Sequence, residues 1–379
     1  MVEVREQSPH VRSGCQVPLI SLYWGGPSLW LVILLPLLEN STMRARALRL
    51  LVMLALRLLM APGTTAAPVA HKVSKVGVLV FGTPPAAPDW KQRSVFVQEL
   101  HHLGWREGEN LSVEYRWAPT QLEPSGVFRL PPADALATEL VRLPVDVIVA
   151  NNRHLIRAIQ RASPTIPIVM IAGDDPVEEG FIAGLARPGG HVTGVDTSIS
   201  AELSTKQLEF LKEAVPAVTR MAVFVTPFVP ATGQILEELQ GAARALGVQL
   251  HVVAVYHPRE IAAAFGTATR EGAGALLVLP SLLFAAHQSR LLALAAQHRL
   301  PAIYWTRSWV TAGGLLAYGP HAADLWQRAA YYVDRLLKGA KPADLPVERP
   351  TRFEFVINVK TAQALGLTLP PTLCSKRMR

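Results

Sequence analysis

From Val76 onward, short apolar runs rich in β-branched residues alternate with longer amphipathic segments. Nine such runs can be identified: VGVLVF (76–81), LSVEYRWA (111–118), VDVIVA (145–150), IPIVMIA (166–172), MAVFVT (221–226), LHVVAVY (250–256), GALLVLP (274–280), PAIYW (301–305) and GLLAY (314–318). The segments between them have helical periodicity, and several end on Gly or Pro. Continuous apolar strands that alternate with helices are typical of parallel sheets buried on both faces. The pattern therefore predicts an α/β, doubly wound architecture.

Nine strand–helix units exceed one compact sheet, so we expect two lobes. The clearest break is ARPGGHVTGVDTS (186–198), where a Pro-Gly-Gly sequence stops a helix and the strand–helix rhythm then restarts. Further crossings are expected near Thr306–Ser308 and in the Pro-rich residues 341–358. The predicted domains are an N-terminal lobe of residues 74–191 plus 308–340, a C-terminal lobe of residues 192–307 plus 341–371, and a tail at 372–379.

The N-terminal part has the features of an export signal. From Met43, three arginines precede an apolar core of about eleven residues and then a region of small residues, the order found in a secretory signal peptide. Residues 43–70 are therefore predicted to be a signal peptide, and the body to be periplasmic or otherwise exported. Residues 1–42 are interpreted as an upstream extension outside the mature protein, with Met43 as the start. The alternative is a membrane anchor at residues 17–38.

The net charge of +8 lies at the two ends of the chain. Residues 1–75 carry a net +5 and the last four residues a further +3, so the body between them holds 26 basic and 26 acidic residues. A neutral body gives no general attraction to phosphate, and nucleic acid is not expected as a partner. The two cysteines, Cys15 and Cys374, lie near opposite ends and cannot build a zinc motif.

In open parallel sheets, ligands bind beyond the carboxyl ends of the strands. Short polar residues in the corresponding loops are Thr83, Asn151, Asn152, Thr226 and Ser281, and several precede helices whose free N–H groups could receive a carboxylate. Aromatic residues recur at the same edge and fit either the core or an apolar pocket wall. The predicted ligand-binding residues are Gly82, Thr83, Asn151, Asn152, Gly173, Asp174, Thr226, Phe228, Ser281, Trp305 and Tyr318.

The stretch MIAGDDPVEEGF (170–181) places four carboxylates within six positions. Asp175 has the position of an N-cap, Pro176 the first helical position, and Glu178 and Glu179 the first turn, so three of the four are explained as the start of a helix from Pro176 to about Ala186. Asp174 remains, either as a ligand for an ammonium or amide group or as a solvated loop residue.

The sequence offers little support for catalysis. No H-x-x-x-H or D-x-D spacing indicates a metal site, and no G-x-S-x-G elbow, Walker motif or dinucleotide fingerprint is present. We therefore expect no catalytic residues, no metal and no cofactor. An enzyme that uses Asp174 and His321 is the weakest alternative.

Several longer stretches resemble the family of ABC-transporter substrate-binding proteins that includes the tryptophan and aromatic amino-acid binding lipoproteins. The resemblance covers about Val76 to Pro371 and rests on segments such as IPIVMIAGDDPVEEGFIAGLARPGGHVTGVD (166–196), HRLPAIYWTRSWVTAGGLLAYGP (298–320) and AAYYVDRLLKGAKPADLPVERPTRFEFVINVKTAQALGL (329–367). It implies a periplasmic-binding-protein-like fold of the first type, with two lobes and three hinge crossings. It also implies capture of a solute by lobe closure and delivery to a membrane permease with its ATPase.

Four loops depart from the usual pattern of that family: GTPPAAPDW after the first strand, ANNRHL before the third helix, TPFVP, and His321 in place of a common Asp. All four lie at the expected ligand edge, so the ligand could differ from that of relatives.

Together these features predict a monomeric, non-enzymatic receptor for a small organic solute, such as an amino acid or an aromatic compound. Thr83, Asn151 and Asn152 would hold its anionic end and Asp174 its cationic end, and the apolar part would lie between Phe228, Trp305 and Tyr318. The alternative is a membrane-tethered sensory or regulatory domain of the same fold.

Overall fold

The computed structural model describes residues 73–82, 91–119, 121–122, 128–129, 133–172, 175–198, 200–227 and 232–375 of the chain. The predicted upstream extension (1–42) and signal peptide (43–70) lie outside these residues, as does the end of the predicted tail. Within the described part, no helix is long and apolar enough to cross a membrane.

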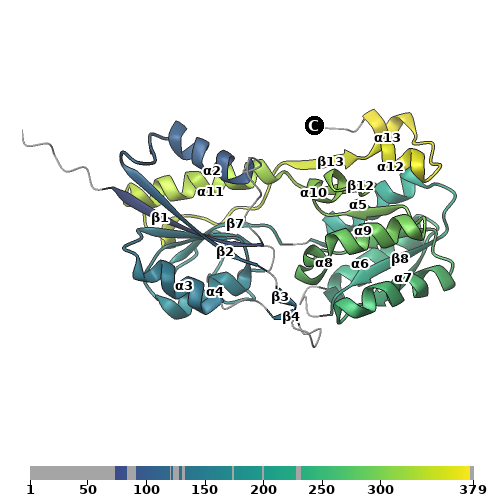
Figure 1. Ribbon diagram of the computed structural model, residues 1–379, viewed down its shortest axis with the longest axis horizontal. Coiled ribbons are helices and arrows are strands. Elements are labelled where there is room, and N and C mark those ends of the chain that lie inside the picture. The colour runs from purple at the N-terminus through teal and green to yellow at the C-terminus, as the bar shows by residue number, and fades with distance from the viewer. Residues whose placement is uncertain are drawn as a thin grey trace, which may run out of the picture. The chain divides into compact units, whose positions relative to one another are not determined.

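The first of two large sheets is entirely parallel and is covered by helices on both faces (Figure 1). Its strands, in spatial order, are β2 (Leu111–Ala118), β1 (Ser74–Phe81), β5 (Val147–Ala150), β6 (Ile168–Ala172) and β7 (Val192–Asp196). Its helices are α2 (Lys91–His102) and α11 (Ala322–Leu337) on one face and α3 (Ala133–Arg142) and α4 (Arg153–Ala162) on the other. Every residue of β5, β6 and β7 is buried, as continuous apolar strands between two helical layers require.

The second sheet has six strands, of which only the edge strand β13 is antiparallel. In spatial order they are β13 (Phe353–Ile357), β12 (Leu316–Pro320), β11 (Ala302–Tyr304), β10 (Ala275–Val278), β8 (Arg220–Val225) and β9 (Gln249–Ala254). One core cluster contains residues of α5 (Ala201–Ala214), α6 (Thr232–Ala245), α12 (Val359–Ala364) and α13 (Pro371–Ser375). The other contains residues of α7 (Ile261–Arg270), α8 (Leu282–Ala286), α9 (Gln288–Gln297) and α10 (Arg307–Thr311).

Four minor elements complete the described structure. The two-residue strands β3 (Gln121–Leu122) and β4 (Phe128–Arg129) form an antiparallel pair of their own. The 3₁₀ turns η1 (Pro258–Glu260) and η2 (Pro342–Asp344) precede α7 and the last crossing, respectively.

The nine predicted strands are all present, and the predicted fold of two doubly wound lobes with three crossings is confirmed. Two further strands, β7 and β13, lie in segments that the sequence predicts to be connections between the lobes. Gly194 shows why β7 can form in its Gly-rich stretch: it has φ +131°, and a Cβ there would lie 2.3 Å from the carbonyl oxygen of Met170 on β6. Only glycine allows this close approach of the two strands.

The crossings between the sheets lie later in the chain than the predicted boundaries. β7 belongs to the first sheet, so the first crossing follows Asp196 instead of residue 191. β12 belongs to the second sheet and α10 packs against it, so the return crossing follows Pro320 instead of residue 307. The last crossing runs through residues 345–352 and ends where β13 begins (Figure 1). Both crossings differ from the predicted boundaries because strand pairing between distant segments, which no local sequence pattern reveals, decides the lobe to which each strand belongs.

The predicted helix from Pro176 to about Ala186 is wrong. The chain makes one turn over residues 176–180 and continues without helical structure. The turn ends at Gly180, which has φ +70°, and the N–H groups of Phe181 and Ile182 both donate to the carbonyl of Pro176. The side chains of Phe181 and Ile182 are buried in the core around β6, and this packing is not compatible with a continued helix.

Candidate functional site

In the first sheet, the predicted site lies where the strand order reverses. β1 has β2 on one side and β5 on the other, so the loops after β1 and β5 leave in different directions, which is the usual place for a ligand in an open parallel sheet. Asn151 follows β5, and its side-chain Oδ1 accepts a 2.7 Å hydrogen bond from the N–H of Phe81 at the end of β1. Gly82 continues from there with φ +123° and donates its N–H to the carbonyl of Ala118. The structure thus brings Gly82 and Asn151 together.

Asn152 has a structural function that its position in the loop conceals. It is the N-cap of α4 and is 9% exposed. Its Oδ1 accepts a 2.9 Å hydrogen bond from the N–H of His154, and its carbonyl accepts the N–H of Ile156. A capping side chain is already occupied by the helix backbone. Both amide oxygens thus accept a backbone N–H, and Asn151 is the less buried of the two side chains.

The second sheet has the same arrangement of strands. β8 lies between β9 and β10, so Thr226 after β8 and Ser281 after β10 flank the corresponding reversal point. Thr226 is buried, and Ser281 is the N-cap of α8, where its Oγ accepts a 3.1 Å hydrogen bond from the N–H of Phe284. Both residues are at the predicted edge, but Ser281, like Asn152, caps a helix.

The structure does not bring Trp305 and Tyr318 together. Trp305 packs with the cluster that includes Trp309, at 4.7 Å between ring centroids. Tyr318 packs with the other cluster, where its ring is 4.9 Å from that of Phe210, and burial raises the pKa of its hydroxyl. The two rings therefore belong to opposite faces of the second sheet. Thr83, Gly173, Asp174 and Phe228 lie outside the described residues.

Two carboxylates of the acidic stretch 170–181, those of Asp175 and Glu179, stabilise the local structure after β6. Asp175 caps the turn after β6, because its Oδ1 accepts hydrogen bonds from the N–H groups of Val177 and Glu178 at 2.9 and 3.1 Å. Glu179 points back to α4, where its carboxylate oxygens lie 3.3 Å from Arg153 Nη1 and 2.5 Å from Arg157 Nη2. The predicted capping function of Asp175 is confirmed for a turn instead of a helix, whereas Glu179 forms ion pairs that the sequence did not indicate.

The charges around α4 keep its histidine neutral. Burial, and then the neighbouring charge of Arg153, lowers the pKa of His154 from its ordinary value to about 4. Desolvation and adjacent cations both disfavour the imidazolium form. At neutral pH the beginning of α4 therefore carries the charges of the two arginines and Glu179 without a histidine charge.

The first and last crossings between the sheets are linked by ion pairs, which we call the hinge network. The carboxylate of Asp196 accepts hydrogen bonds from Arg349 and from the backbone and hydroxyl of Ser198. Arg328 on α11 forms a bidentate ion pair with Glu348, whose carbonyl accepts the N–H of Asp196. The network joins the first crossing to the last one.

His321 belongs to the same region. The ring Nδ1 of His321 lies 2.8 Å from Asp324 Oδ1, and the backbone N–H of His321 donates to the carbonyl of Arg352. The guanidinium of Arg352 in turn lies 3.1 Å from Asp324 Oδ1. All three residues are thus engaged with one another at the return crossing. Across the described part of the chain, no group of three or more His, Cys, Asp or Glu side chains could hold a metal ion.

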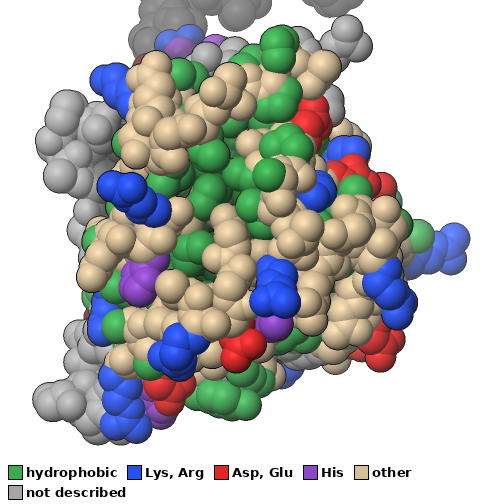
Figure 2. Space-filling view, turned by 90° about the vertical axis from the view of Figure 1, so that its right-hand side faces the viewer, with side chains coloured by type: hydrophobic (Ala, Val, Ile, Leu, Met, Phe, Trp, Pro, Cys, Tyr) green, Lys and Arg blue, Asp and Glu red, His purple; other side chains and the backbone are tan. Residues whose placement is uncertain are grey.

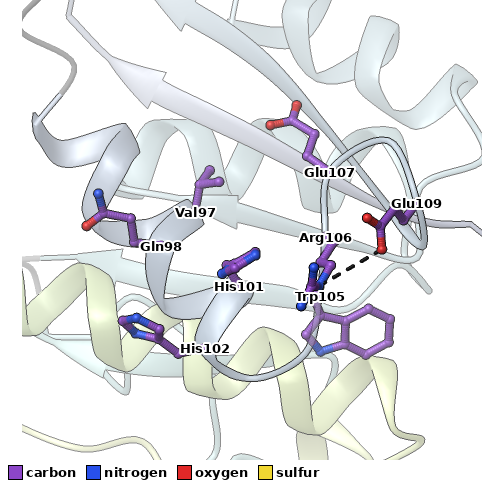
Figure 3. Close-up of a pocket in the computed structure, with 8 residues that line it drawn as sticks. All are labelled: Val97, Gln98, His101, His102, Trp105, Arg106, Glu107 and Glu109. Carbon is purple, nitrogen blue, oxygen red and sulfur yellow. Dashed lines mark ion pairs between the residues drawn. The ribbon is translucent and has the colours of Figure 1, made fainter.

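Two hollows are present elsewhere, and none of the predicted site residues lines either. The first, of about 360 Å³, lies at the end of α2 and the following loop (Figure 3). It is lined by Val97, Gln98, His101, His102, Trp105, Arg106, Glu107 and Glu109. The indole N–H of Trp105 donates to Asp334 on α11 at 2.9 Å, which makes this residue part of the lobe's packing. The second hollow, of about 330 Å³, adjoins the hinge network.

The charged side chains on the outer face of the second lobe are scattered. Figure 2 shows Lys and Arg side chains set singly over this face, with Asp and Glu beside several of them. The described side chains there form no continuous basic patch, which agrees with the even count of acidic and basic residues in the body.

The ion pairs that the sequence did not indicate join residues that are distant in the chain. Arg153 and Glu179 are 26 residues apart, and Arg307 and Glu354 are 47 apart. Each arginine directly follows a strand-end loop, which is the one signal that could have drawn attention to it. The choice of acidic partner had no sequence signal.

Comparisons with known proteins agree with this architecture. The sequence pattern of the family described as ABC transporter substrate binding protein matches residues 75–377. A tyrosine-binding protein of Clostridioides difficile (strain R20291) is 24% identical over 277 residues, covering 73% of this chain and 77% of that protein.

Two solved structures have the same fold. A conserved domain protein of Vibrio cholerae has a TM-score of 0.69 and 25% identity, covering 81% of this chain and 99% of its own. An ABC domain from Streptococcus pneumonia, solved in complex with L-Trp, has a TM-score of 0.67 and 23% identity, covering 80% and 98%. The fold is that of the type I periplasmic binding proteins. Because the family pattern spans nearly the whole described body, this protein belongs to the family of ABC transporter substrate-binding proteins.

Proposed function

We propose that this protein captures a free amino acid, with aromatic amino acids as the first candidates, and delivers it to a membrane permease with its ATPase. The observation that carries the proposal is the pair of strand-order reversals, one in each sheet, each flanked by a short polar residue: Asn151 in the first and Thr226 in the second. The tyrosine-binding relative and the neighbour solved with L-Trp support this ligand class.

The available groups at these edges suit a small polar ligand with an apolar part. Asn151 offers an amide beside the end of β1, and the loop after β11 offers the ring of Trp305. Small-molecule sites typically combine an apolar wall with a few convergent polar groups. Thr83, Asp174 and Phe228 remain part of the proposed site as expectations from the sequence.

Capture would be coupled to hinge motion. A ligand that contacts both lobes stabilises the conformation in which both contacts are made, and so shifts the population toward it. The protein would act in the periplasm, or otherwise outside the cytoplasm, after removal of residues 43–70, as a monomer and without catalysis.

The test is a thermal-shift and calorimetric screen of the purified chain against the twenty amino acids, aromatic acids and aromatic amines. We expect one or a few amino acids to raise the melting temperature, with a shift that grows with the logarithm of the ligand concentration above its Kd. Absence of binding by every amino acid would reject the proposal. Binding of a solute without an amino-acid group would retain the receptor function and change the ligand class.

A further inference from the structure

We infer that the ion pair between Arg307 and Glu354 recognises the charged ammonium and carboxylate groups of the amino acid, an inference that rests on the proposed function. The pair lies in the second lobe, where α10 begins after β11. Neither residue belongs to the site predicted from the sequence.

The geometry of the pair leaves one end of each group unused. Glu354 Oε2 accepts hydrogen bonds from both Arg307 Nε, at 2.7 Å, and Arg307 Nη2, at 2.5 Å. Among the residues that the structure describes, Arg307 Nη1 and Glu354 Oε1 have no hydrogen-bond partner. Glu354 Oε2 thus orients the guanidinium, while the Nη1 donor of Arg307 and the Oε1 acceptor of Glu354 remain available for a ligand.

The burial of the two groups is unequal in a way that suits a binding site. The side chain of Glu354 is 7% exposed, whereas that of Arg307 is 48% exposed. The small exposed part of Glu354 includes Oε1, so this carboxylate oxygen is open to a further cationic donor. The exposed edge of the guanidinium is open to an anionic group, and its planar N–H groups match the geometry of a carboxylate.

The backbone places this pair at the ligand edge of the second sheet. Glu354 on β13 pairs with Gly319 near the carboxyl end of β12. A Cβ at Gly319 would lie 1.9 Å from the carbonyl oxygen of Trp305, so the loop after β11 passes directly over this strand end. Arg307 begins α10 two residues after Trp305, so the ion pair and the aromatic side chain proposed as an apolar wall come from the same loop.

The charges of the pair match those of a free amino acid. An amino acid at neutral pH is a zwitterion, with a carboxylate that Arg307 Nη1 can bind and an ammonium that Glu354 Oε1 can bind. The ion pair and the zwitterion are each neutral, so the complex leaves no uncompensated charge in the site. A solute with only one of the two groups would leave one member of the pair without its partner.

The experiment compares three probes for every amino acid that binds in the screen: the amino acid, its decarboxylated amine and its deaminated acid. For tyrosine these are L-tyrosine, tyramine and 3-(4-hydroxyphenyl)propionate. We expect the wild-type protein to bind the amino acid about 100-fold more tightly than either analogue, since each charged hydrogen bond contributes about 10- to 100-fold. The double variant Arg307→Gln/Glu354→Gln, which removes both charges together, should lose most of this difference.

The double variant avoids the buried unpaired charge that Arg307→Gln alone would create. The matched control is Arg161→Gln/Asp134→Asn, which removes an exposed ion pair between α3 and α4 and should leave the three-probe comparison unchanged. If the wild-type protein binds an amino acid and the Arg307/Glu354 double variant keeps the full discrimination, this inference is overturned while the proposed function stands. If no amino acid binds the wild-type protein, both are overturned.

Discussion

Asp196 and Arg349 join the first and last crossings between the sheets through a 3.1 Å contact between a carboxylate oxygen and Nε. The side chain of Asp196 is fully buried, whereas that of Arg349 is 65% exposed. Asp196 ends β7, and Arg349 follows Glu348, which pairs with β7 through backbone hydrogen bonds. The ion pair therefore adds a side-chain link where the backbone already holds the two crossings together.

Asp196→Asn should lower the free energy of unfolding by about 1–3 kcal/mol, because the buried carboxylate loses its charged hydrogen bonds. Denaturant unfolding of Asp196→Asn, Arg349→Gln and the double variant measures the coupling between the two residues. We expect a coupling energy of about 0.5–2 kcal/mol. A coupling energy of zero would show that the ion pair between Arg349 and Asp196 does not contribute to the free energy of unfolding.

Glu179→Gln should loosen the turn that follows β6. The carboxylate of Glu179 is bound by Arg153 and Arg157, and its loss leaves two neighbouring arginines without their shared acid. We expect a loss of about 1–2 kcal/mol in stability and faster hydrogen exchange at residues 177–180.

The control for Glu179 is Glu178→Gln, because Glu178 is an exposed neighbour in the same turn. A surface substitution of this kind should change stability by less than about 0.5 kcal/mol. Equal effects of the two substitutions would mean that the ion pairs with α4 do not hold the turn.

The lowered pKa of His154 leads us to expect that the protein loses stability at acid pH. Its pKa is lowered to about 4 in the folded protein, below the ordinary value of 6.5, so the unfolded chain binds the proton more readily. The contribution of the neutral histidine is complete above about pH 6.5 and is lost as the pH falls toward 4. Unfolding experiments from pH 7.5 to 4 should show this decline, and His154→Gln should reduce it. An unchanged slope in the variant would rule out His154 as its source.

Asn152→Ala should destabilise α4 by about 1 kcal/mol, since it removes the N-cap hydrogen bond to His154. Asn152→Ser retains a capping oxygen and should recover most of that loss. Thermal unfolding measures how much the N-cap contributes to stability. Calorimetry with the amino acid that binds measures whether Asn152 also contributes to ligand affinity. If Asn152→Ser recovers stability but not affinity, the amide also contacts the ligand.

The local patterns were sufficient for much of the fold. Continuous apolar runs separated by amphipathic segments indicated the nine strands, because a strand buried on both faces can carry few polar residues. The same patterns failed at β7, whose sequence VTGVD contains a glycine and ends in an aspartate. Its burial depends on the close approach to Met170 and on the Arg349 partner of Asp196, neither of which is local.

The candidate site divides in the same way. Positions after parallel strands follow from chain order alone, and the sequence accordingly placed Asn151, Ser281 and Trp305 at strand ends. The functions of their side chains do not follow from position, because a polar residue before a helix can either cap it or face a ligand. Asn152 and Ser281 cap helices, and Trp305 and Tyr318 pack on opposite faces of one sheet.

The sequence by itself determined the α/β class, the order of the strands along the chain and the strand ends at which a ligand would bind, since these depend on local periodicity and chain direction. Only the tertiary structure decided which strand belongs to which sheet, where the chain crosses between sheets, and which charged residues meet. Arg307 and Glu354 lie 47 residues apart and are joined only because β13 pairs antiparallel with β12 beside the start of α10. Such pairings depend on backbone hydrogen bonds and packing between distant segments, and no local pattern encodes them.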